Sequence, residues 1–284
     1  MNLQERKEIL VRLGAYLQSD DAGCQEAKRR ASAENAWFTP EFIELSASNI
    51  AQQFLTEPNL QMLIDRYSIP AENATPKRVG IVMAGNIPMV GFHDLLCTFL
   101  TGHYAMIKLS SKDTVLIQFL IRKMNEWNAA VAPYFTVSEM LKGCDAYIAT
   151  GSNNSSKYFE HYFGKYPHII RKNRTSVAIL TGEETDEELE FLADDVYRYF
   201  GLGCRNVTKI FVPEGYNFER LLQVFKKYNY LADHPKYKNN YDYNLAIHLL
   251  NKRYYMSNES LLLVEDASPF SRISQLPAVS LVVH

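Results

Sequence analysis

The sequence predicts an α/β fold built on a parallel sheet. Short apolar runs of strand length, such as 79–83 and 145–149, alternate with longer segments of helical periodicity, such as 114–127. Strands that alternate with helices favour parallel pairing through crossover helices. The chain has 284 residues, 47% of them hydrophobic and 22% charged, which is enough for a large core and is typical of a globular protein with two domains.

Composition and charge exclude several classes of protein. Lys and Arg total 30 against 32 Asp and Glu, a balance that argues against nucleic-acid binding. No apolar run approaches the roughly 18 residues of a membrane span, and the first ten residues lack a signal-peptide core. We therefore expect a cytoplasmic protein whose four cysteines are reduced thiols. No His and Cys spacing resembles a zinc site, so no metal is predicted.

The first part of the chain is expected to hold an N-terminal helical region and the first domain. Apolar residues recur every four positions at Ile9, Leu13 and Leu17, which predicts helix in the first 75 residues. Alternation follows, with strands predicted at 79–83, 104–109, 145–149 and 176–180 and helices at 89–100, 114–127 and 154–163. We place this first domain at 1–182.

A second, smaller domain is predicted at 183–284. Its expected helices are 185–200, 218–228 and 244–254, and its expected strands are 207–212, 261–264 and 279–283. The chain stops directly after the last apolar run. We therefore expect either that the sequence is truncated or that the partner strands of 279–283 come from elsewhere.

Two residues are candidates for catalysis. Cys204 lies in a glycine-containing loop before a predicted strand, where a thiolate could approach a substrate closely. The alternative is a buried thiol that acts as a small hydrophobic residue. Asn86 follows a glycine at a strand end, where its amide could donate to a developing oxyanion. The alternative is an ordinary turn asparagine.

Two further turns could hold a ligand, because ligands of parallel sheets bind at the carboxyl ends of the strands. Lys108, with the hydroxyls of Ser110 and Ser111, could hold a ribose or phosphate, or could be a solvated strand end. Gly151 and Ser152 lie between a strand and a helix, where free N–H groups attract phosphate. Simple helix capping is the alternative there. The basic residues Arg171, Lys172 and Arg174 are interpreted as a solvated loop, with phosphate binding as the alternative.

The order of these signals resembles the aldehyde dehydrogenase superfamily. An AGNIP turn is followed by IKLSSKD, by ATGS and by GLGCRNVTKIFVP. Within that superfamily, AGNIPMVGFHDLLCTFLTGHYAMIKLSSKD is similar to the acyl-CoA reductases, the family of the bioluminescence fatty acid reductase component. The resemblance covers roughly residues 76–215 and implies an aldehyde dehydrogenase-like fold, with a parallel-sheet dinucleotide-binding domain and a smaller α/β catalytic domain.

The resemblance also implies roles for the candidate residues. Cys204 would be the nucleophile that holds the acyl group as a thioester, and Asn86 with the Cys204 amide would form the oxyanion hole. Lys108 would bind the adenosine ribose, and Gly151 with Ser152 would lie along the dinucleotide. A homo-oligomer is expected as well.

Two departures from the superfamily pattern refine this expectation. Hydrolytic members carry a glutamate roughly twenty residues after the Thr-Gly-Ser turn, whereas 170–175 contains no carboxylate, so a base that activates water is missing. NAD-preferring members often place a glutamate where this chain has Ser111. A hydroxyl accepts a 2′-phosphate more readily than a carboxylate does, which predicts NADPH as the cofactor.

The sequence therefore predicts NADPH-dependent reduction of an acyl-CoA, or of another activated acyl group on a donor protein, to an aldehyde. Two alternatives stay open: a hydrolytic aldehyde dehydrogenase that uses another base, and a non-catalytic acyl-binding or assembly subunit of the same fold.

Overall fold

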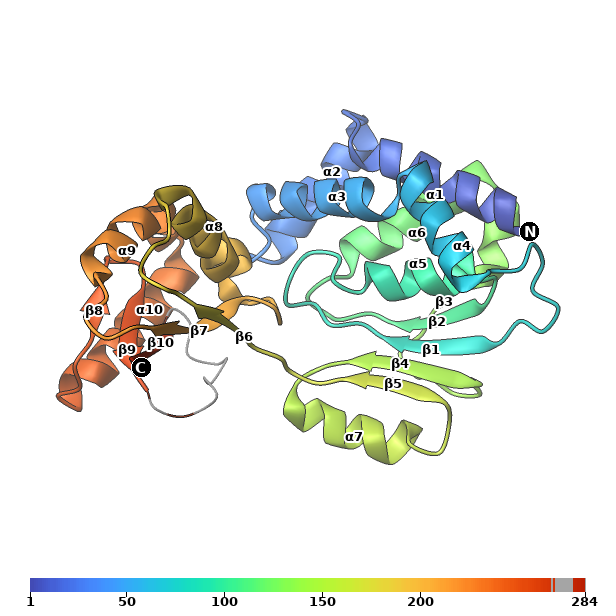
Figure 1. The fold of residues 1–284 in the computed structure, drawn as a ribbon. Coiled ribbons are helices and arrows are strands. Elements are labelled where there is room, and N and C mark those ends of the chain that lie inside the picture. Colours follow the sequence, from blue (N-terminus) through green and yellow to red (C-terminus); the bar gives the residue numbers. More distant parts are fainter. Residues whose placement is uncertain (267, 269–277, 284) are drawn as a thin grey trace. The chain divides into compact units, whose positions relative to one another are not determined.

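The structure is a computed structural model that describes residues 1–266, 268 and 278–283. The chain divides into two compact units, Met1–Asn173 and Arg174–His284, which are described separately (Figure 1). The division falls at 173/174, whereas the sequence placed the domain boundary at 182/183. Within the described residues, no helix is both long enough and apolar enough to cross a membrane.

Four helices form the outer layer of the first unit, as the sequence predicts. They are α1 (Leu3–Leu17), α2 (Ala22–Glu34), α3 (Pro40–Phe54) and α4 (Glu57–Tyr67). Each begins at a polar cap: in α1 the Asn2 side chain accepts a hydrogen bond from the Glu5 N–H, and in α3 Thr39 precedes a proline at the first helical position. The apolar face of α1 is fully buried through Leu10 and Leu13.

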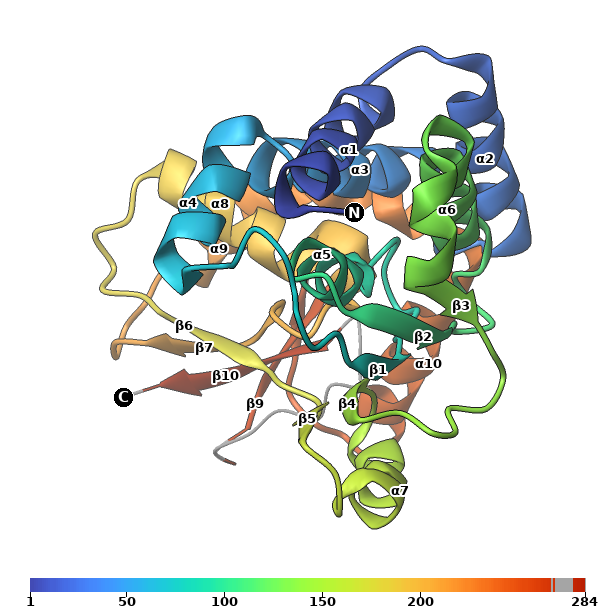
Figure 2. The same ribbon diagram turned by 90° about the vertical axis from the view of Figure 1, so that its right-hand side faces the viewer.

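A five-stranded, wholly parallel sheet lies beneath these helices. Its order is β3-β2-β1-β4-β5. The strands are β1 (Arg78–Val82), β2 (Tyr104–Lys108), β3 (Phe135–Val137), β4 (Ala146–Thr150) and β5 (His168–Arg171). Helices α5 (Phe92–Leu100) and α6 (Val115–Trp127) cover one face, between the sheet and the N-terminal helices, and α7 (Asn153–Phe163) lies on the other face below β4 and β5 (Figures 1 and 2). The fold class predicted for this part is confirmed.

The sequence missed two strands of this sheet. β5 was interpreted in part as a solvated basic loop, because it is only four residues long and its first two residues are exposed. β3 is three residues long, with two of them exposed. The predicted strand at 176–180 is observed as β6 (Ser176–Ile179), but it belongs to the sheet of the second unit rather than to the first.

The second unit contains a mixed sheet of order β6-β7-β10-β9-β8. Its other strands are β7 (Val207–Val212), β8 (Met256–Ser257), β9 (Leu262–Glu265) and β10 (Ala278–Val283), and only β8 pairs antiparallel. β10 lies between β7 and β9. The expectation that its partner strands come from elsewhere is therefore wrong.

The helices of the second unit differ from the prediction at their ends. They are α8 (Asp186–Tyr197), α9 (Phe218–Phe225) and α10 (Pro235–Leu250), with 3₁₀ segments η2 (Arg198–Gly201) and η3 (Lys226–Asp233). Helix α10 begins nine residues before the predicted start at 244, because His234 caps it and Pro235 occupies its first position. Its buried face includes Tyr237 and Tyr241, whose amphipathic side chains give no clear apolar period.

The loop that joins β1 to α5 is held by the segment after β2. The predicted helix 89–100 starts only at Phe92, because Met89 has φ +54° and donates its N–H to the Asp113 Oδ2 at 2.7 Å. Asp113 is buried, its Oδ1 has no hydrogen-bond partner among the described residues, and burial raises its pKa to about 7. A buried carboxyl group thus anchors this loop.

Replacing this carboxyl group should change how stability depends on pH. A carboxyl whose pKa is raised in the folded state stabilises fully below its unfolded pKa of about 4, and this contribution is lost as pH rises through about 7. Asp113→Asn does not titrate and keeps an acceptor for the Met89 N–H. The free energy of unfolding of the wild type, minus that of Asp113→Asn, should therefore fall between about pH 4 and 7, by at most about 1.4 kcal/mol per pH unit. Urea unfolding of both proteins at a series of pH values measures this difference in free energy. A difference that does not change with pH would contradict the burial argument.

Candidate active site

Three of the predicted site segments meet at one edge of the first sheet. β1, β2 and β4 are parallel and in register, with Val82 opposite both Lys108 and Ala149. Their carboxyl ends therefore coincide. The Asn86 turn follows β1, Lys108 ends β2, and Gly151 follows β4. This is the edge at which parallel sheets bind their ligands.

The Asn86 turn and the serines after β2 are packed together. A Cβ atom at Gly85 would lie 2.4 Å from the Ser110 Oγ, so only glycine allows the two segments to approach this closely. The Ser110 Oγ also accepts a hydrogen bond from the Lys112 N–H at 3.3 Å. Ser110 therefore has a structural contact, whether or not it also meets a cofactor. Asn86 itself is half-buried.

Lys108 is exposed at the end of β2 but is not simply solvated. Its Nζ donates to the Glu139 carbonyl oxygen at 2.9 Å, which holds the side chain at the carboxyl edge. Ser111 and Lys112 are exposed beyond it. Two neighbouring residues, Ser111 with a hydroxyl and Lys112 with an amine, are thus exposed in the segment predicted to contact the ribose of a dinucleotide.

In the turn of Gly151 and Ser152, the structure shows helix capping, which the sequence analysis gave as the alternative to phosphate binding. Ser152 is the N-cap of α7, and its Oγ accepts from the Ser155 N–H at 3.1 Å. Gly151 donates its N–H to the Arg171 carbonyl oxygen at 3.1 Å. A Cβ atom there would lie 2.9 Å from the Phe159 ring, so packing against α7 also requires glycine.

Cys204 belongs to the second unit and is exposed, in the turn between η2 and β7. Cys24 and Cys144 are buried and Cys97 is half-buried. The alternative reading of Cys204 as a buried small hydrophobic residue is therefore wrong. Because the two units are described separately, the catalytic pairing of Cys204 with Asn86 stays a prediction.

Asn206 is a positioning residue that the sequence analysis missed. Its side-chain oxygen accepts from the Gly203 N–H at 2.8 Å, and its amide donates to the carbonyl oxygens of Asp195 and Arg198 at 2.7 and 3.1 Å. It is buried and ties the Cys204 turn to the end of α8. The segment before it is kinked, with positive φ at Tyr199 and Phe200. An asparagine two residues after the cysteine was the only sequence signal.

The interpretation of Arg171, Lys172 and Arg174 as a solvated loop is wrong for Arg171, whereas Lys172 and Arg174 are exposed and lie beyond the end of β5. Arg171 ends β5, and its Nη1 donates to both carboxylate oxygens of Asp94 on α5, at 2.8 and 2.7 Å. Lys172 reaches the other face of the sheet and pairs with Glu160 on α7 at 2.7 Å. Successive strand residues point to opposite faces, which explains the two different partners.

The charges around Arg171 include a histidine. His93 lies beside Asp94, with 3.8 Å between its Nδ1 and the nearer carboxylate oxygen, and its ring lies 3.7 Å from the Cys97 sulfur. Contact with the Asp94 carboxylate, and then with Cys97, raises the pKa of His93 to about 10. Asp94 is therefore placed between two cations.

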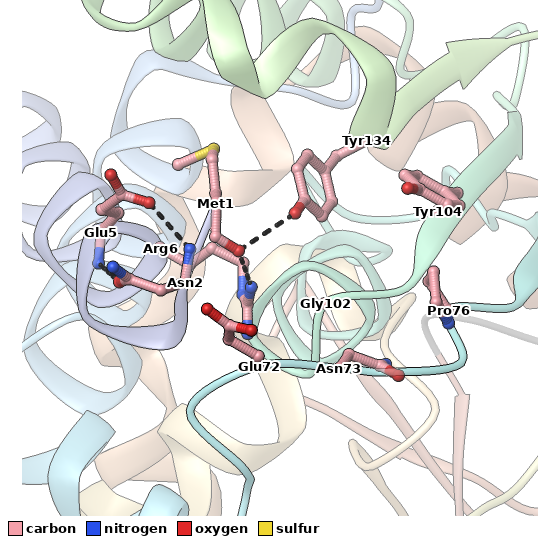
Figure 3. A pocket seen from close by; sticks show the side chains of 10 residues that line it. All are labelled: Met1, Asn2, Glu5, Arg6, Glu72, Asn73, Pro76, Gly102, Tyr104 and Tyr134. Carbon is pink, nitrogen blue, oxygen red and sulfur yellow. Dashed lines mark hydrogen bonds between the residues drawn. The ribbon is translucent and has the colours of Figure 1, made fainter.

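A polar pocket of about 470 Å³ lies away from these residues, at the amino ends of β1 and β2 (Figure 3). Its lining includes Arg6, which is buried and donates to the carbonyl oxygens of Leu100 and Met1 at 3.2 and 2.5 Å. A cation at the C-terminal end of α5 stabilises that helix. The pocket is rimmed by the carboxylates of Glu5 and Glu72 and holds no nucleophile, so it is not the candidate site.

Comparisons with known proteins agree with this geometry. The chain is similar over its whole length to a putative aldehyde dehydrogenase from Burkholderia cenocepacia, with a TM-score of 0.70, 14% identity and coverage of 70% of that chain. It is likewise similar to the aldehyde dehydrogenase KauB from Pseudomonas aeruginosa, with a TM-score of 0.68, 14% identity and coverage of 68%. A third similar structure is aldehyde dehydrogenase C from Pseudomonas syringae with NAD+ and octanal, with a TM-score of 0.71, 10% identity, full coverage of this chain and 68% of that one.

These likenesses establish the aldehyde dehydrogenase-like fold. No curated protein matches the sequence. The family model described as acyl-CoA reductase (LuxC) matches residues 62–257, which include both the Asn86 turn and Cys204. The protein thus belongs to the acyl-CoA reductase (LuxC) family.

Proposed function

We propose that this protein reduces an acyl-CoA, or another activated acyl thioester, to an aldehyde with NADPH, through a thioester on Cys204. The observation that carries the proposal is the exposed thiol of Cys204 in a rigid turn of a chain that belongs to the acyl-CoA reductase family. Its general class, an oxidoreductase acting on aldehyde or acyl substrates, agrees with the family and the fold. A cytoplasmic location and a homo-oligomeric state stay predictions.

The residues present fit a dinucleotide at the carboxyl edge of the first sheet. Gly151 presents backbone without a side chain, Lys108 is fixed by its bond to the Glu139 carbonyl, and Ser111 is exposed. When bound, a reduced nicotinamide supplies the hydride for the reaction. Lys108 would hold the ribose, and the 150–152 turn would leave room for the backbone of the cofactor.

The chain's own residues would carry the acyl chemistry as follows. The Cys204 thiolate attacks the acyl carbonyl, and the Asn86 amide and the Cys204 N–H donate to the resulting oxyanion. The carbonyl re-forms as the C–S bond to the donor thiol breaks, leaving the acyl group on Cys204. Addition of hydride to this thioester carbonyl gives a second oxyanion on the same donors, and its collapse releases the aldehyde and the Cys204 thiolate.

The lack of a free carboxylate favours reduction over hydrolysis. Residues 170–175 contain none, and the carboxylate that contacts this segment, Asp94, accepts both bonds from Arg171. A thioester on Cys204 would therefore survive long enough to be reduced.

An acyl adduct on Cys204 is the direct test of the nucleophile. Incubation with acyl-CoAs of varied length should add one acyl mass to the wild type, since the thiolate displaces CoA. Cys204→Ala should show no adduct and no aldehyde formation. Cys97→Ala is the matched control, because it removes another accessible thiol and should keep the adduct. Peptide mass spectrometry checks both, and a persistent adduct in Cys204→Ala would exclude Cys204 as the nucleophile.

The oxyanion role of Asn86 predicts a loss of rate rather than of acyl-donor binding. Asn86→Ala should lower kcat by about 10²–10³, because one oxyanion donor is removed. The rate at which iodoacetamide alkylates Cys204 should stay close to that of the wild type, which separates loss of the donor from damage to the cysteine turn. Initial rates of NADPH oxidation measure the effect. A kcat within about threefold of the wild type would contradict the assignment.

The preference for NADPH predicts the effect of a carboxylate at position 111. Ser111→Glu should lower the ratio of kcat/KM for NADPH over NADH by about tenfold or more, because the new charge repels the 2′-phosphate. Ser111→Ala, which adds no charge, should change this ratio much less. Steady-state rates with both cofactors decide it, and an unchanged ratio in the glutamate variant would mean that the 2′-phosphate lies elsewhere.

A further inference from the structure

We propose that Arg171, held in place by Asp94, binds a phosphate group of a ligand at the candidate site. This inference rests on the proposed function and deepens it, since it names a residue that would recognise the phosphate of NADPH or of the acyl-CoA. It concerns a residue that the sequence analysis assigned to a solvated loop, with phosphate binding as the less favoured alternative.

The ion pair holds the guanidinium group in place through one of its three nitrogens, Nη1. The Asp94 side chain is about nine-tenths buried, and both of its oxygens accept from the same nitrogen, Nη1, at 2.8 and 2.7 Å. The Arg171 side chain is one-third exposed. Within the part of the chain that the structure describes, its Nε and Nη2 carry no hydrogen bond. These two nitrogens form the planar fork that suits a phosphate or carboxylate.

The position of Arg171 places this fork at the catalytic edge. Arg171 is the last residue of β5, level with Thr150 at the end of β4, and its carbonyl accepts the Gly151 N–H. Asp94 lies in the first turn of α5, the helix that continues from the Asn86 loop. The fixed cation is thus next to two of the segments predicted to contact ligands.

The local charge favours an anion. Two positive groups, Arg171 and His93, flank the single Asp94 carboxylate, so the cluster carries an excess positive charge at neutral pH. An arginine already held in its bound geometry loses little conformational freedom when it binds a ligand. Both ligands of the proposed reaction carry phosphates, and the fork would donate to two oxygens of one phosphate group.

The test compares ligand binding in variants that keep the fold. Arg171→Gln alone would leave the Asp94 carboxylate buried and unpaired, which destabilises proteins strongly. The double variant Asp94→Asn, Arg171→Gln keeps two polar side chains of similar size and removes both charges. Arg171→Lys keeps the ion pair but loses the fork. Lys172→Gln is the matched control, because Lys172 follows in sequence but pairs with Glu160 on the opposite face.

Titration calorimetry of the full chain with NADPH and, separately, with desulfo-CoA gives the dissociation constants without turnover. In the double variant we expect Kd for one or both ligands to rise about 10- to 100-fold, the usual effect of losing hydrogen bonds to a charged group. In Arg171→Lys the same Kd should rise by more than about twofold. Lys172→Gln should bind both ligands like the wild type.

The separate titrations with NADPH and with desulfo-CoA identify which ligand supplies the phosphate group. A loss confined to NADPH assigns Arg171 to the dinucleotide, and a loss confined to desulfo-CoA assigns it to the acyl donor. If the wild type binds both ligands and Arg171→Lys and the folded double variant bind them equally well, the inference about Arg171 is wrong while the proposed function stands. If the wild type binds neither ligand, the proposed function fails and the inference fails with it.

Discussion

The register of β1 in the first sheet is the constraint on which the rest of the site depends. β1 is paired on both sides by parallel strands, and Val82 is level with Lys108 on one side and Ala149 on the other. The three strands are parallel and each has five residues, so their carboxyl ends lie within one residue of each other and the following loops emerge at the same edge. A slip of one residue would turn every side chain of a strand to the opposite face and would separate these loops. Strand pairing thus brings together candidate site residues that are far apart in the sequence.

The sequence was informative where the strands are fully apolar and where turns follow them directly. The runs 79–83, 104–109 and 145–149 predicted β1, β2 and β4, and the turns after them predicted the carboxyl edge. β5 was lost because a four-residue strand ending in an arginine carries no such signal. The Asp94–Arg171 contact joins residues 77 positions apart, and no local pattern reports a pair of this kind. Cys204 was singled out by its glycine-containing loop and then by the resemblance, and its exposure needed the structure.

Two buried carboxyl groups fix the β1–α5 connection in different ways. Asp113 accepts one backbone N–H and has no ion-pair partner among the described residues, and its burial raises its pKa. Asp94 faces a guanidinium, so its charge is compensated and it holds α5 against β5. One group anchors the segment that follows Asn86 and the other anchors the first turn of the helix. Asn86 therefore lies in a loop whose C-terminal end is held by two contacts. Asp113, after β2, binds Met89, and Arg171, at the end of β5, binds Asp94.

The close approach of Gly85 to Ser110 limits the size of the side chain at position 85. Any side chain at position 85 would occupy the space of the serine hydroxyl, and any larger residue at position 110 would push against the backbone of the turn. The two positions share one small volume. An alanine at position 85 would therefore require a smaller residue, glycine, at position 110.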